Sequence, residues 1–372
     1  MLVGVPKEIK NHEYRVGLTP ASVNEIVQNG HSVIIEENAG IGSGFCNQEY
    51  LDVGASIVKS AKQVFSDAEL IIKVKEPQPQ ECQMLNAGQA LFTYLHLAPD
   101  RQQTQLLLES KATCIAYETV TDKQGSLPLL APMSEVAGRM SIQAGAYHLQ
   151  KAQGGLGVLL AGVPGVAPAK VVIIGGGVVG ANAAKVAIGM GADVVIIDRA
   201  LPRLRQLDVE FNGRLKTLYS NSQTIEDVVT QADLVIGAVL VPGAAAPKLV
   251  NHQLVKKMKA GSVLVDVAID QGGCFATSKP TTHQDPTYVV DGVVHYCVAN
   301  MPGGVARTST FALNNATLPY VLALVNKGIL PALQQDAFFL QGLNVYKGQL
   351  TNQAVALAHG MPYVAADLAV HN

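Results

Sequence analysis

The sequence predicts an α/β protein built from two Rossmann-type domains, each a doubly wound parallel sheet, with a cleft between them. Two observations lead to this prediction. Over residues 1–128, short runs of β-branched residues alternate strictly with helical segments. Residues 170–198 then read as strand, glycine-rich turn, helix and strand. Such alternation is typical of parallel sheets whose two faces are both covered by helices.

The composition agrees with buried sheets and argues against several other classes of protein. A chain of 372 residues suggests two or three domains. Its 48% hydrophobic and 15% charged residues suit buried parallel sheets and large subunit interfaces. The net charge of −2 argues against electrostatic binding of nucleic acid. The N-terminus lacks the apolar segment of a signal peptide, and no run reaches the roughly 18 apolar residues of a membrane span.

The five cysteines are odd in number, scattered, and form no C-x-x-C pair. A disulfide framework or a zinc site is therefore not expected, and no bound metal is expected. The expected location is a reducing cytoplasm.

The first domain is expected to begin with a strand at 2–5 and a helix that starts at Pro20, with Thr19 as its N-cap. This helix should run to about Gln28. Further strands are predicted at 31–36, 55–58, 70–75, 90–96 and 113–117, with helices near Gln48 and at 60–65, 80–85 and 101–110.

A linker is predicted at 125–132, after which Ser134 is expected to cap a helix over 135–153. The second domain should contain strands at 170–174, 193–197, 215–219, 234–238 and 262–267, with helices at 181–189, 224–230 and 251–258. The tail after Pro302 reads as mainly helical, at 313–327 and 330–336, and is expected to return to the first domain. The expected domains are therefore 1–128 plus 305–372, and 129–304 as an insertion whose two crossings suit a hinge.

The run from Gly175 to Gly180 fits the G-x-G-x-x-G pattern of dinucleotide-binding turns. Gly175 would make the tight turn, and Gly177 would let the backbone approach a pyrophosphate because it has no Cβ. Gly180 would let the helix pack on the strand, and the helix N-terminus offers N–H groups to phosphates. The alternative is a glycine-rich turn in another α/β protein, but the flanking strand, helix and acid favour dinucleotide binding.

Asp198 ends the strand after this helix, where a carboxylate can accept from ribose hydroxyls and repel a 2′-phosphate. The predicted cofactor is therefore NAD. Arg199, Arg203 and Arg205 weaken the preference over NADP, because a nearby arginine can accept a phosphate. They are more readily explained as lining the adenosine side or facing solvent.

Three side chains that can carry chemistry lie at the carboxyl ends of predicted strands, where open parallel sheets bind ligands. These are Lys75, His96 and Asp270, and Arg15 lies in the loop before the first helix. Two cations can hold a carboxylate, an imidazole can act as acid and base near neutral pH, and a carboxylate can stabilise a developing cation.

Each of these residues also has a structural explanation. A lysine at a strand end is usually solvated, Arg15 could be a surface charge, His96 could be a core residue, and Asp270 could cap a turn. Taken together with NAD, they suggest oxidation at a carbon that bears nitrogen or oxygen, next to a carboxylate.

Over nearly its whole length the sequence resembles the L-alanine dehydrogenases. The resemblance is carried by these segments: VGVPKEIKNHEYRVGLTP (3–20), KVKEP (73–77), FTYLHLA (92–98), PMSEVAGRMS (132–141), GVLLAGVPGV (157–166), the glycine fingerprint, VAIDQGG (267–273) and HYCVANMPGGVARTST (295–310). The family is related to the NAD-binding component of transhydrogenase and, more distantly, to saccharopine-forming enzymes.

The resemblance implies reversible conversion of L-alanine, NAD and water to pyruvate, ammonium and NADH. Arg15 and Lys75 would hold the substrate carboxylate, with Lys75 also near the reacting carbonyl. His96 would be the general acid/base, and Asp270 would assist attack by water or ammonia. The family is typically hexameric. The residues expected around NAD are Ser134, Gly175, Gly177, Val178, Val179, Gly180, Asp198, Arg203, Ser220, Val239, Leu240, Val267, Ile269, Asp270, Lys279, Val298, Asn300 and Met301.

Three positions depart from the family pattern, which commonly has glutamate at Ala276, arginine at Lys279 and alanine at Gly304. They would affect the cofactor side and leave the catalytic set intact. Three other functions remain open: a non-catalytic NAD-binding subunit, an oxidoreductase for another amino acid or for glyoxylate, and an NAD sensor. The first would need a membrane partner, the second differs only in pocket size, and the third is hard to reconcile with a complete catalytic set.

Overall fold

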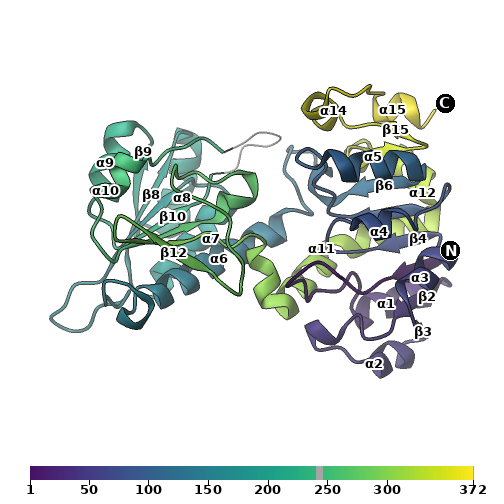
Figure 1. Cartoon of the computed structure of the whole chain (residues 1–372), viewed down its shortest axis with the longest axis horizontal. Helices are drawn as coiled ribbons and strands as arrows, with labels where there is room; N and C mark the ends of the chain where they lie inside the picture. Colours follow the sequence, from purple (N-terminus) through teal and green to yellow (C-terminus); the bar gives the residue numbers. More distant parts are fainter. Residues whose placement is uncertain (240–245, 372) are drawn as a thin grey trace. The chain divides into compact units, whose positions relative to one another are not determined.

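A computed structural model describes residues 1–239 and 246–371 (Figure 1). The chain divides into two compact units. Unit 1 comprises Met1–Met133 and Gly303–Asn372, and unit 2 comprises Ser134–Pro302. The chain after Pro302 thus belongs with the N-terminal segment.

Unit 1 is built on an eight-stranded sheet of order β15-β14-β6-β5-β4-β1-β2-β3. Its six N-terminal strands pair in parallel, and the β14–β15 hairpin adds an antiparallel edge next to β6. The strands are β1 (Leu2–Val5), β2 (Ser32–Glu36), β3 (Ser56–Val58), β4 (Leu70–Ile72), β5 (Ala90–Thr93), β6 (Thr113–Ala116), β14 (Leu343–Tyr346) and β15 (Gln349–Leu350).

Helices flank this sheet, with α5 in front of β6 in Figure 1 and α12 on the far side. The helices of unit 1 are α1 (Pro20–Gln28), α2 (Asn47–Asp52), α3 (Ala61–Asp67), α4 (Pro79–Cys82), α5 (Arg101–Ser110), α11 (Ala306–Lys327), α12 (Ile329–Gln335), α13 (Ala337–Leu340), α14 (Gln353–His359) and α15 (Ala366–Ala369), with 3₁₀ turns η1 (Ile41–Ser43) and η2 (Tyr117–Thr119).

Unit 2 has a seven-stranded sheet of order β12-β13-β11-β10-β7-β8-β9, parallel except for β12. The strands are β7 (Lys170–Ile174), β8 (Asp193–Asp198), β9 (Lys216–Tyr219), β10 (Leu234–Gly237), β11 (Val263–Asp266), β12 (Thr287–Val290) and β13 (Val293–Tyr296). The helices are α6 (Ala131–His148), α7 (Val178–Gly189), α8 (Leu201–Phe211), α9 (Ser222–Val229) and α10 (His252–Lys256), with 3₁₀ turns η3 (Lys151–Gln153), η4 (Val267–Gln271) and η5 (Met301–Val305).

The prediction of two mostly parallel, helix-covered sheets is confirmed. In unit 2 one core layer packs α7 and neighbouring segments on β7, β8 and β10 through residues such as Val171, Ile173 and Ala184. A second layer on the opposite face includes Val172 and Val235, so consecutive strand residues point to opposite buried faces.

Each sheet has a point where its strand order reverses. In unit 1 the chain proceeds outward from β1 to β3 and then, on the other side, from β4 to β6. In unit 2 the same reversal lies between β7 and β10. Ligands of open α/β sheets bind outside the carboxyl ends of the strands at such switch points.

Several predicted boundaries are wrong for identifiable reasons. The strand expected to reach residue 75 ends at Ile72, and the one expected to reach His96 ends at Thr93. Side-chain carboxylates replace sheet partners there: Glu8 accepts from the N–H of Val74, and Glu118 accepts from that of His96. The strand expected to reach residue 267 likewise ends at Asp266, which caps η4 by accepting from Ala268 N–H.

Ser134 does not cap a helix, because α6 already begins at Ala131 and ends at His148. The predicted linker therefore ends inside the first turn of this helix. The tail is also less helical than expected, since residues after α13 form the β14–β15 hairpin. This hairpin makes the sheet of unit 1 mixed.

Among the described residues, no single helix combines the length and apolar character needed to cross a membrane. One bent pair, Met301–Lys327 with Ile329–Gln335, meets the length and composition criteria across a bend of 118°.

Candidate functional site

The glycine-rich turn of unit 2 joins β7 to α7 at the switch point. Gly175 has φ 106°, and a Cβ there would lie 2.5 Å from the carbonyl oxygen of Ala238 at the end of β10. A Cβ on Gly180 would lie 1.8 Å from the Gly175 oxygen, so the helix packs directly on the turn. A Cβ on Gly177 would meet no described atom within 4 Å. Gly177 therefore leaves open space at the N-terminus of α7, as a pyrophosphate would need.

Asp198 lies at the end of β8 beside this turn. Its Oδ2 accepts from Gly176 N–H at 2.6 Å, and its Oδ1 accepts from Ala200 N–H at 2.7 Å. Arg203 Nε donates to the Gly176 carbonyl at 2.6 Å. Both side chains thus fix the backbone of the turn, and Asp198 stands where a ribose hydroxyl acceptor is expected.

The other predicted cofactor residues lie in several loops and turns of unit 2. Val178 and Val179 form the first turn of α7, and the backbone N–H of Ser220 donates to the Asp198 carbonyl at 3.0 Å. Leu240 lies outside the described residues. The remainder are Ser134 in α6, Val239 after β10, Val267 and Ile269 in η4, Val298 and Asn300 after β13, and Met301 in η5.

Lys279 is exposed and lies over the ring of Tyr288, with Nζ 4.4 Å from the ring centre. Its backbone N–H donates to the Tyr288 hydroxyl at 2.8 Å. At this departure from the family pattern, the lysine ammonium therefore lies over an aromatic ring.

Asp270 is exposed in η4, and the turn that carries it is held by a buried carboxylate that sequence reasoning missed. Asp266 is fully buried and accepts from Ser278 Oγ at 2.5 Å and Cys274 N–H at 3.0 Å. Burial raises its pKa above the ordinary value, despite the hydrogen bonds from Ser278, Phe275 and Cys274. Only its position at a strand end, four residues before Asp270, could have pointed to it.

Arg15 in unit 1 is buried, with 2% of its surface exposed. Its Nε and Nη2 donate to the two carboxylate oxygens of Glu13 at 2.6 and 2.5 Å. Although burial disfavours the charged form, Glu13 raises the pKa of Arg15 above its ordinary value. The guanidinium is thus a permanently charged group in a fixed orientation.

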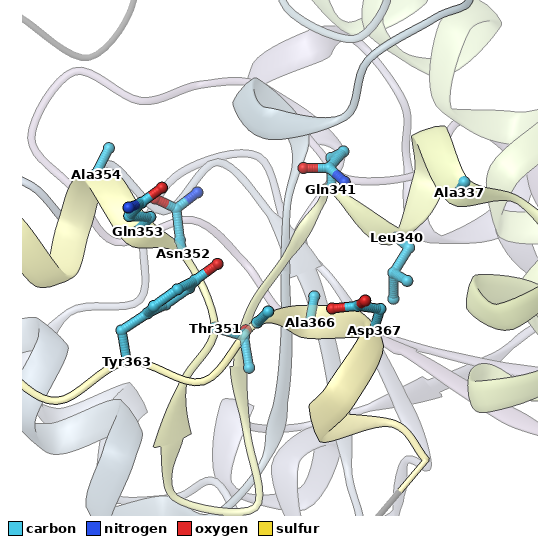
Figure 2. Close-up of a pocket in the computed structure, with 11 residues that line it drawn as sticks. Ala337, Leu340, Gln341, Thr351, Asn352, Gln353, Ala354, Tyr363, Ala366 and Asp367 are labelled. Atoms are coloured by element: carbon cyan, nitrogen blue, oxygen red, sulfur yellow. The ribbon is translucent and has the colours of Figure 1, made fainter.

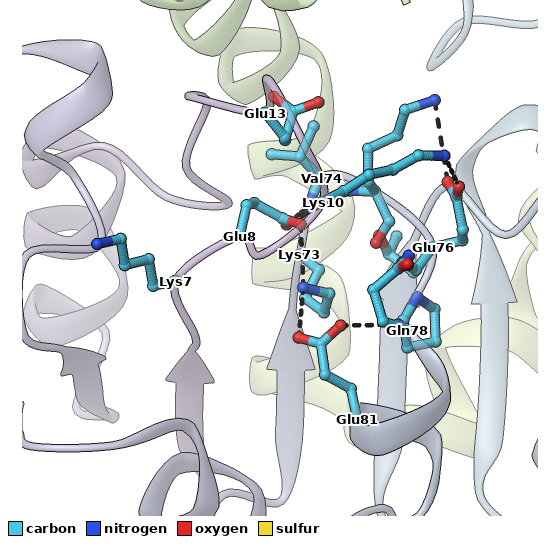
Figure 3. Close-up of polar contacts among 12 residues, drawn as sticks. Lys7, Glu8, Lys10, Glu13, Lys73, Val74, Glu76, Gln78 and Glu81 are labelled. Atoms are coloured by element: carbon cyan, nitrogen blue, oxygen red, sulfur yellow. Dashed lines mark hydrogen bonds and ion pairs between the residues drawn. The ribbon is translucent and has the colours of Figure 1, made fainter.

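Lys75 follows β4 at the switch point of unit 1 and is 8% exposed. Its Nζ lies 3.9 Å from Glu76 Oε2, while Glu76 Oε1 accepts from Lys10 (Figure 3). Burial alone would raise the pKa of Glu76, but Lys75 and Lys10 hold it below its ordinary value. Glu76 is therefore an ionised partner of both lysines.

A buried ion cluster, Glu8–Lys73–Glu81, contacts the backbone of Lys75 through Glu8. Lys73 is fully buried, and its Nζ donates to Glu8 Oε2 at 3.0 Å and to Glu81 Oε1 at 2.9 Å (Figure 3). Although burial lowers it, the two carboxylates hold the pKa of Lys73 above its ordinary value. Lys73 is thus enclosed between two carboxylates just after β4 ends at Ile72.

His96 lies beyond β5 and keeps its side chain 41% exposed. Its φ is 50°, in the left-handed region, and Glu118 Oε1 accepts its backbone N–H at 2.6 Å. The imidazole stacks on Tyr94 with ring centres 5.8 Å apart, and its Nδ1 lies 3.9 Å from Glu118 Oε1. His96 is thus an oriented, accessible histidine, which favours the functional interpretation over a core residue.

Unit 1 brings Arg15, Lys75 and His96 to the same end of its sheet. Glu76 interacts electrostatically with Lys75 and His96, and Tyr94, which stacks on His96, interacts with Arg15. A pair of buried cations beside an accessible imidazole suits a small carboxylate with a reacting carbon next to it. Asp270 belongs to unit 2.

Comparison with known proteins gives matches over nearly the whole chain. Residues 4–137 match "Alanine dehydrogenase/PNT, N-terminal domain", and residues 141–353 match the corresponding C-terminal domain. Alanine dehydrogenase of Halomonas elongata is 62% identical over 98% of this chain and 99% of its own, and that of Methanococcus maripaludis is 57% identical over 100% of both. The chain belongs to the alanine dehydrogenase family.

Solved structures agree with this family assignment. A structure of L-alanine dehydrogenase superposes with a TM-score of 0.94 at 56% identity, covering 97% of this chain and 99% of that one. A transhydrogenase from Sinorhizobium meliloti shares the fold, with a TM-score of 0.81 at 23% identity over 95% of this chain and 100% of that one. This member of the alanine dehydrogenase family is an NAD-dependent oxidoreductase that interconverts alanine and pyruvate.

A hollow of about 620 Å³ lies elsewhere in unit 1 of this alanine dehydrogenase family member (Figure 2). It is lined by residues of α13, α14, α15 and the segments between them, including Thr351, Tyr363 and Asp367. None of its lining residues is a predicted site residue. Among the described residues, no group of three or more His, Cys, Asp or Glu side chains is arranged to hold a metal ion.

Proposed function

We propose that Arg15, Lys75, His96 and Asp270 carry out the reversible oxidative deamination of L-alanine. In this reaction L-alanine, NAD⁺ and water give pyruvate, ammonium, NADH and a proton. The observation that carries the proposal is the pair of buried cations, Arg15 and Lys75, beside the accessible His96. Unit 1 would thus supply the substrate-binding residues, and unit 2 would bind the cofactor.

Substrate binding in this proposal begins with the carboxylate of alanine. Arg15 is oriented by Glu13 and Lys75 is held near Glu76, so both cations are in place before substrate arrives. Fixed charges in a site that excludes water bind an anion more strongly than mobile, solvated ones. This contact would fix Cα so that its single hydrogen faces the hydride acceptor.

NAD supplies the hydride acceptor, and the glycine turn of unit 2 would hold its pyrophosphate. The open space at Gly177, the free N-terminus of α7 and the carboxylate of Asp198 fit a dinucleotide. The other cofactor residues proposed are Ser134, Arg203, Ser220, Val239, Leu240, Val267, Ile269, Lys279, Val298, Asn300 and Met301.

Loss of hydride from Cα converts the amine to an iminium ion, and Asp270 would stabilise that developing positive charge. Water then adds to the iminium carbon to give a carbinolamine, and ammonia leaves to give the ketone of pyruvate. Both steps move protons, which His96 would accept and return as general base and acid. Glu118 and Tyr94 orient His96 for this role.

Two further features belong to this proposal. We propose a homohexamer, which agrees with the resemblance and with the apolar composition of the chain. We also propose a cytoplasmic location, which agrees with five free cysteines.

The direct test follows NADH absorbance after the purified protein is mixed with NAD and L-alanine at alkaline pH. Formation of NADH with L-alanine, and much less with larger amino acids, is the expected result. A signal with another amino acid but none with alanine would overturn the substrate assignment. No signal with any amino acid, but tight NADH binding, would favour a non-catalytic NAD-binding subunit.

A further inference from the structure

The switch point of unit 1 places Glu8 against the backbone of Lys75. Glu8 lies shortly after β1, and Lys75 lies shortly after the neighbouring β4. One carboxylate oxygen, Oε1, accepts from the N–H of Val74 at 2.7 Å and from that of Lys75 at 3.3 Å. Glu8 therefore supplies hydrogen-bond acceptors for the backbone that follows β4, just beyond the point where β4 stops pairing with β1.

The second oxygen of the same carboxylate fixes the orientation of the first. Glu8 Oε2 accepts from Lys73 Nζ at 3.0 Å, and Lys73 is held from its other side by Glu81 at 2.9 Å. Glu8 and Lys73 are both buried, at 7% and 0% exposure. A buried carboxylate with both oxygens engaged has little freedom to rotate, because each broken bond would leave a desolvated group unpaired.

The direction of Lys75 depends on this contact. Its carbonyl oxygen accepts from Thr93 Oγ1 at 2.9 Å, so Glu8 holds the N–H side and Thr93 holds the carbonyl side of the same residue. The side chain then extends toward Glu76, and its Nζ lies 3.9 Å from Glu76 Oε2. A lysine side chain has four rotatable bonds and lacks the rigid planar head group of arginine. Its backbone is therefore the part that the fold can orient.

We propose that Glu8 is a positioning residue for the alanine reaction: it fixes the backbone of Lys75 so that its ammonium meets the substrate carboxylate. Glu8 does not itself contact substrate. Lys73 acts one step further away by holding the Glu8 carboxylate. Glu81 balances the charge of Lys73, and its other oxygen accepts from the N–H of Gln78 at 2.8 Å at the start of α4, away from the backbone of Lys75. This inference rests on the proposed role of Lys75.

The chain offers a matched pair of variants. Glu8→Ala and Glu81→Ala each remove one carboxylate from Lys73 and leave it paired with the other. Only Glu8 also bonds the backbone of Lys75. Steady-state kinetics with pyruvate, ammonium and NADH gives KM for pyruvate and kcat, and fluorescence titration gives Kd for NADH.

Glu8→Ala is expected to raise KM for pyruvate about tenfold or more, while Kd for NADH changes less than twofold because unit 2 is untouched. Glu81→Ala should raise KM less than threefold. Glu8→Gln should fall between them, since its amide oxygen can still accept from the Val74 and Lys75 N–H groups. If Glu8→Ala does not fold, Glu8→Gln is compared with Glu81→Gln. Both variants remove one charge beside Lys73, but only Glu8→Gln weakens the acceptor of the Lys75 N–H, so equal values of KM for pyruvate in the two variants would overturn the proposal.

Equal effects of Glu8→Ala and Glu81→Ala would also overturn it, because charge balance alone would then explain both. Lys75→Met separates this inference from the proposed function. If Lys75→Met leaves KM for pyruvate unchanged, the proposed role of Lys75 is wrong. If Lys75→Met raises KM but Glu8→Ala does not, only the positioning role of Glu8 is wrong.

Discussion

His96 adopts a backbone conformation that L-residues with a Cβ rarely take. Its φ of 50° is kept because Glu118 accepts the backbone N–H and Tyr94 packs against the ring. Such conformations cost on the order of 1–3 kcal/mol and tend to cluster at functional sites. The imidazole gains a fixed direction while remaining accessible to a reacting molecule.

Replacement of His96 tests whether this conformation serves catalysis. His96→Ala is expected to lower kcat for alanine oxidation by about 10²–10⁴-fold, the usual contribution of a positioned general acid/base. His31→Ala is a matched control, because His31 is a partly buried histidine of unit 1 whose ring bonds the N-terminus and Asn326, away from the proposed site. Turnover of His96→Ala within threefold of the control would refute the acid/base assignment.

His295 gives unit 2 a dependence of stability on pH. It is fully buried between Thr277 and the carbonyl of Val293, and burial lowers its pKa below the ordinary value of 6.5. Below 6.5 the unfolded chain takes up a proton that the folded chain does not. The free energy of unfolding should therefore fall as pH drops from that value toward the lowered folded pKa.

Urea unfolding at about pH 8 and about pH 5.5 measures this contribution. His295→Gln should be less stable than wild type at the higher pH because it loses a buried hydrogen bond. Its free energy of unfolding should also fall less than that of wild type between the higher and the lower pH. If the free energy of unfolding falls by the same amount on acidification in His295→Gln as in wild type, His295 does not cause the pH dependence.

The glycine turn shows how one element combines folding and binding. Gly175 and Gly180 have no room for a side chain because backbone atoms occupy the space. Gly177 faces open space, at φ −67°, which any residue can adopt. Gly175 and Gly180 are therefore needed by the fold, and we propose that Gly177 is needed by the ligand.

Gly177→Ala and Gly180→Ala separate these two requirements. Gly177→Ala should unfold at a temperature close to that of wild type but bind NADH about tenfold or more weakly, because the new methyl group occupies the pyrophosphate position. Gly180→Ala should lower the unfolding temperature, because its methyl group would overlap the Gly175 carbonyl. Thermal unfolding and NADH fluorescence titration check both, and unchanged NADH affinity in Gly177→Ala would contradict the assignment.

The sequence predicted elements well where one local signal determines them. Thr19 accepts from Ser22 N–H at the start of α1, as expected of an N-cap before proline, and α5 and β7 have their predicted bounds. Strand ends were predicted poorly because Glu8 and Glu118 replace sheet partners from distant positions, and because Asp266 caps the turn that follows its own strand. The hairpin of β14 and β15 was missed because its pairing with β6 joins residues more than 200 apart in sequence.

At the level of the molecule, the proposed function divides between two units. The glycine turn identifies the cofactor from local sequence alone, whereas no local pattern identifies the substrate. Arg15, Lys75 and His96 come from three separate loops, and their grouping in unit 1 depends on its sheet order. Strand-end and loop positions suggested these residues, and the resemblance to alanine dehydrogenases assigned their roles, while the contacts of Glu8, Lys73 and Asp266 emerged only from the packed structure.

This division predicts separable defects. Arg15→Met should raise KM for pyruvate by about tenfold or more, the effect of losing a hydrogen bond between charged groups, and leave Kd for NADH nearly unchanged. Asp198→Ala should raise Kd for NADH and leave KM for pyruvate nearly unchanged. Kinetics and NADH titration of both variants provide the check, and a shared defect in both parameters for either variant would argue against the division.

The most direct measurement is a crystal structure of the protein with NADH and pyruvate. We expect the pyruvate carboxylate to lie at roughly 2.7–3.2 Å from the nitrogens of Arg15 and Lys75. Its carbonyl oxygen should point toward His96, and the cofactor pyrophosphate should lie on the turn from Gly175 to Gly180. Pyruvate bound away from Arg15 and Lys75, for example in the hollow beside Tyr363, would refute the proposed substrate site.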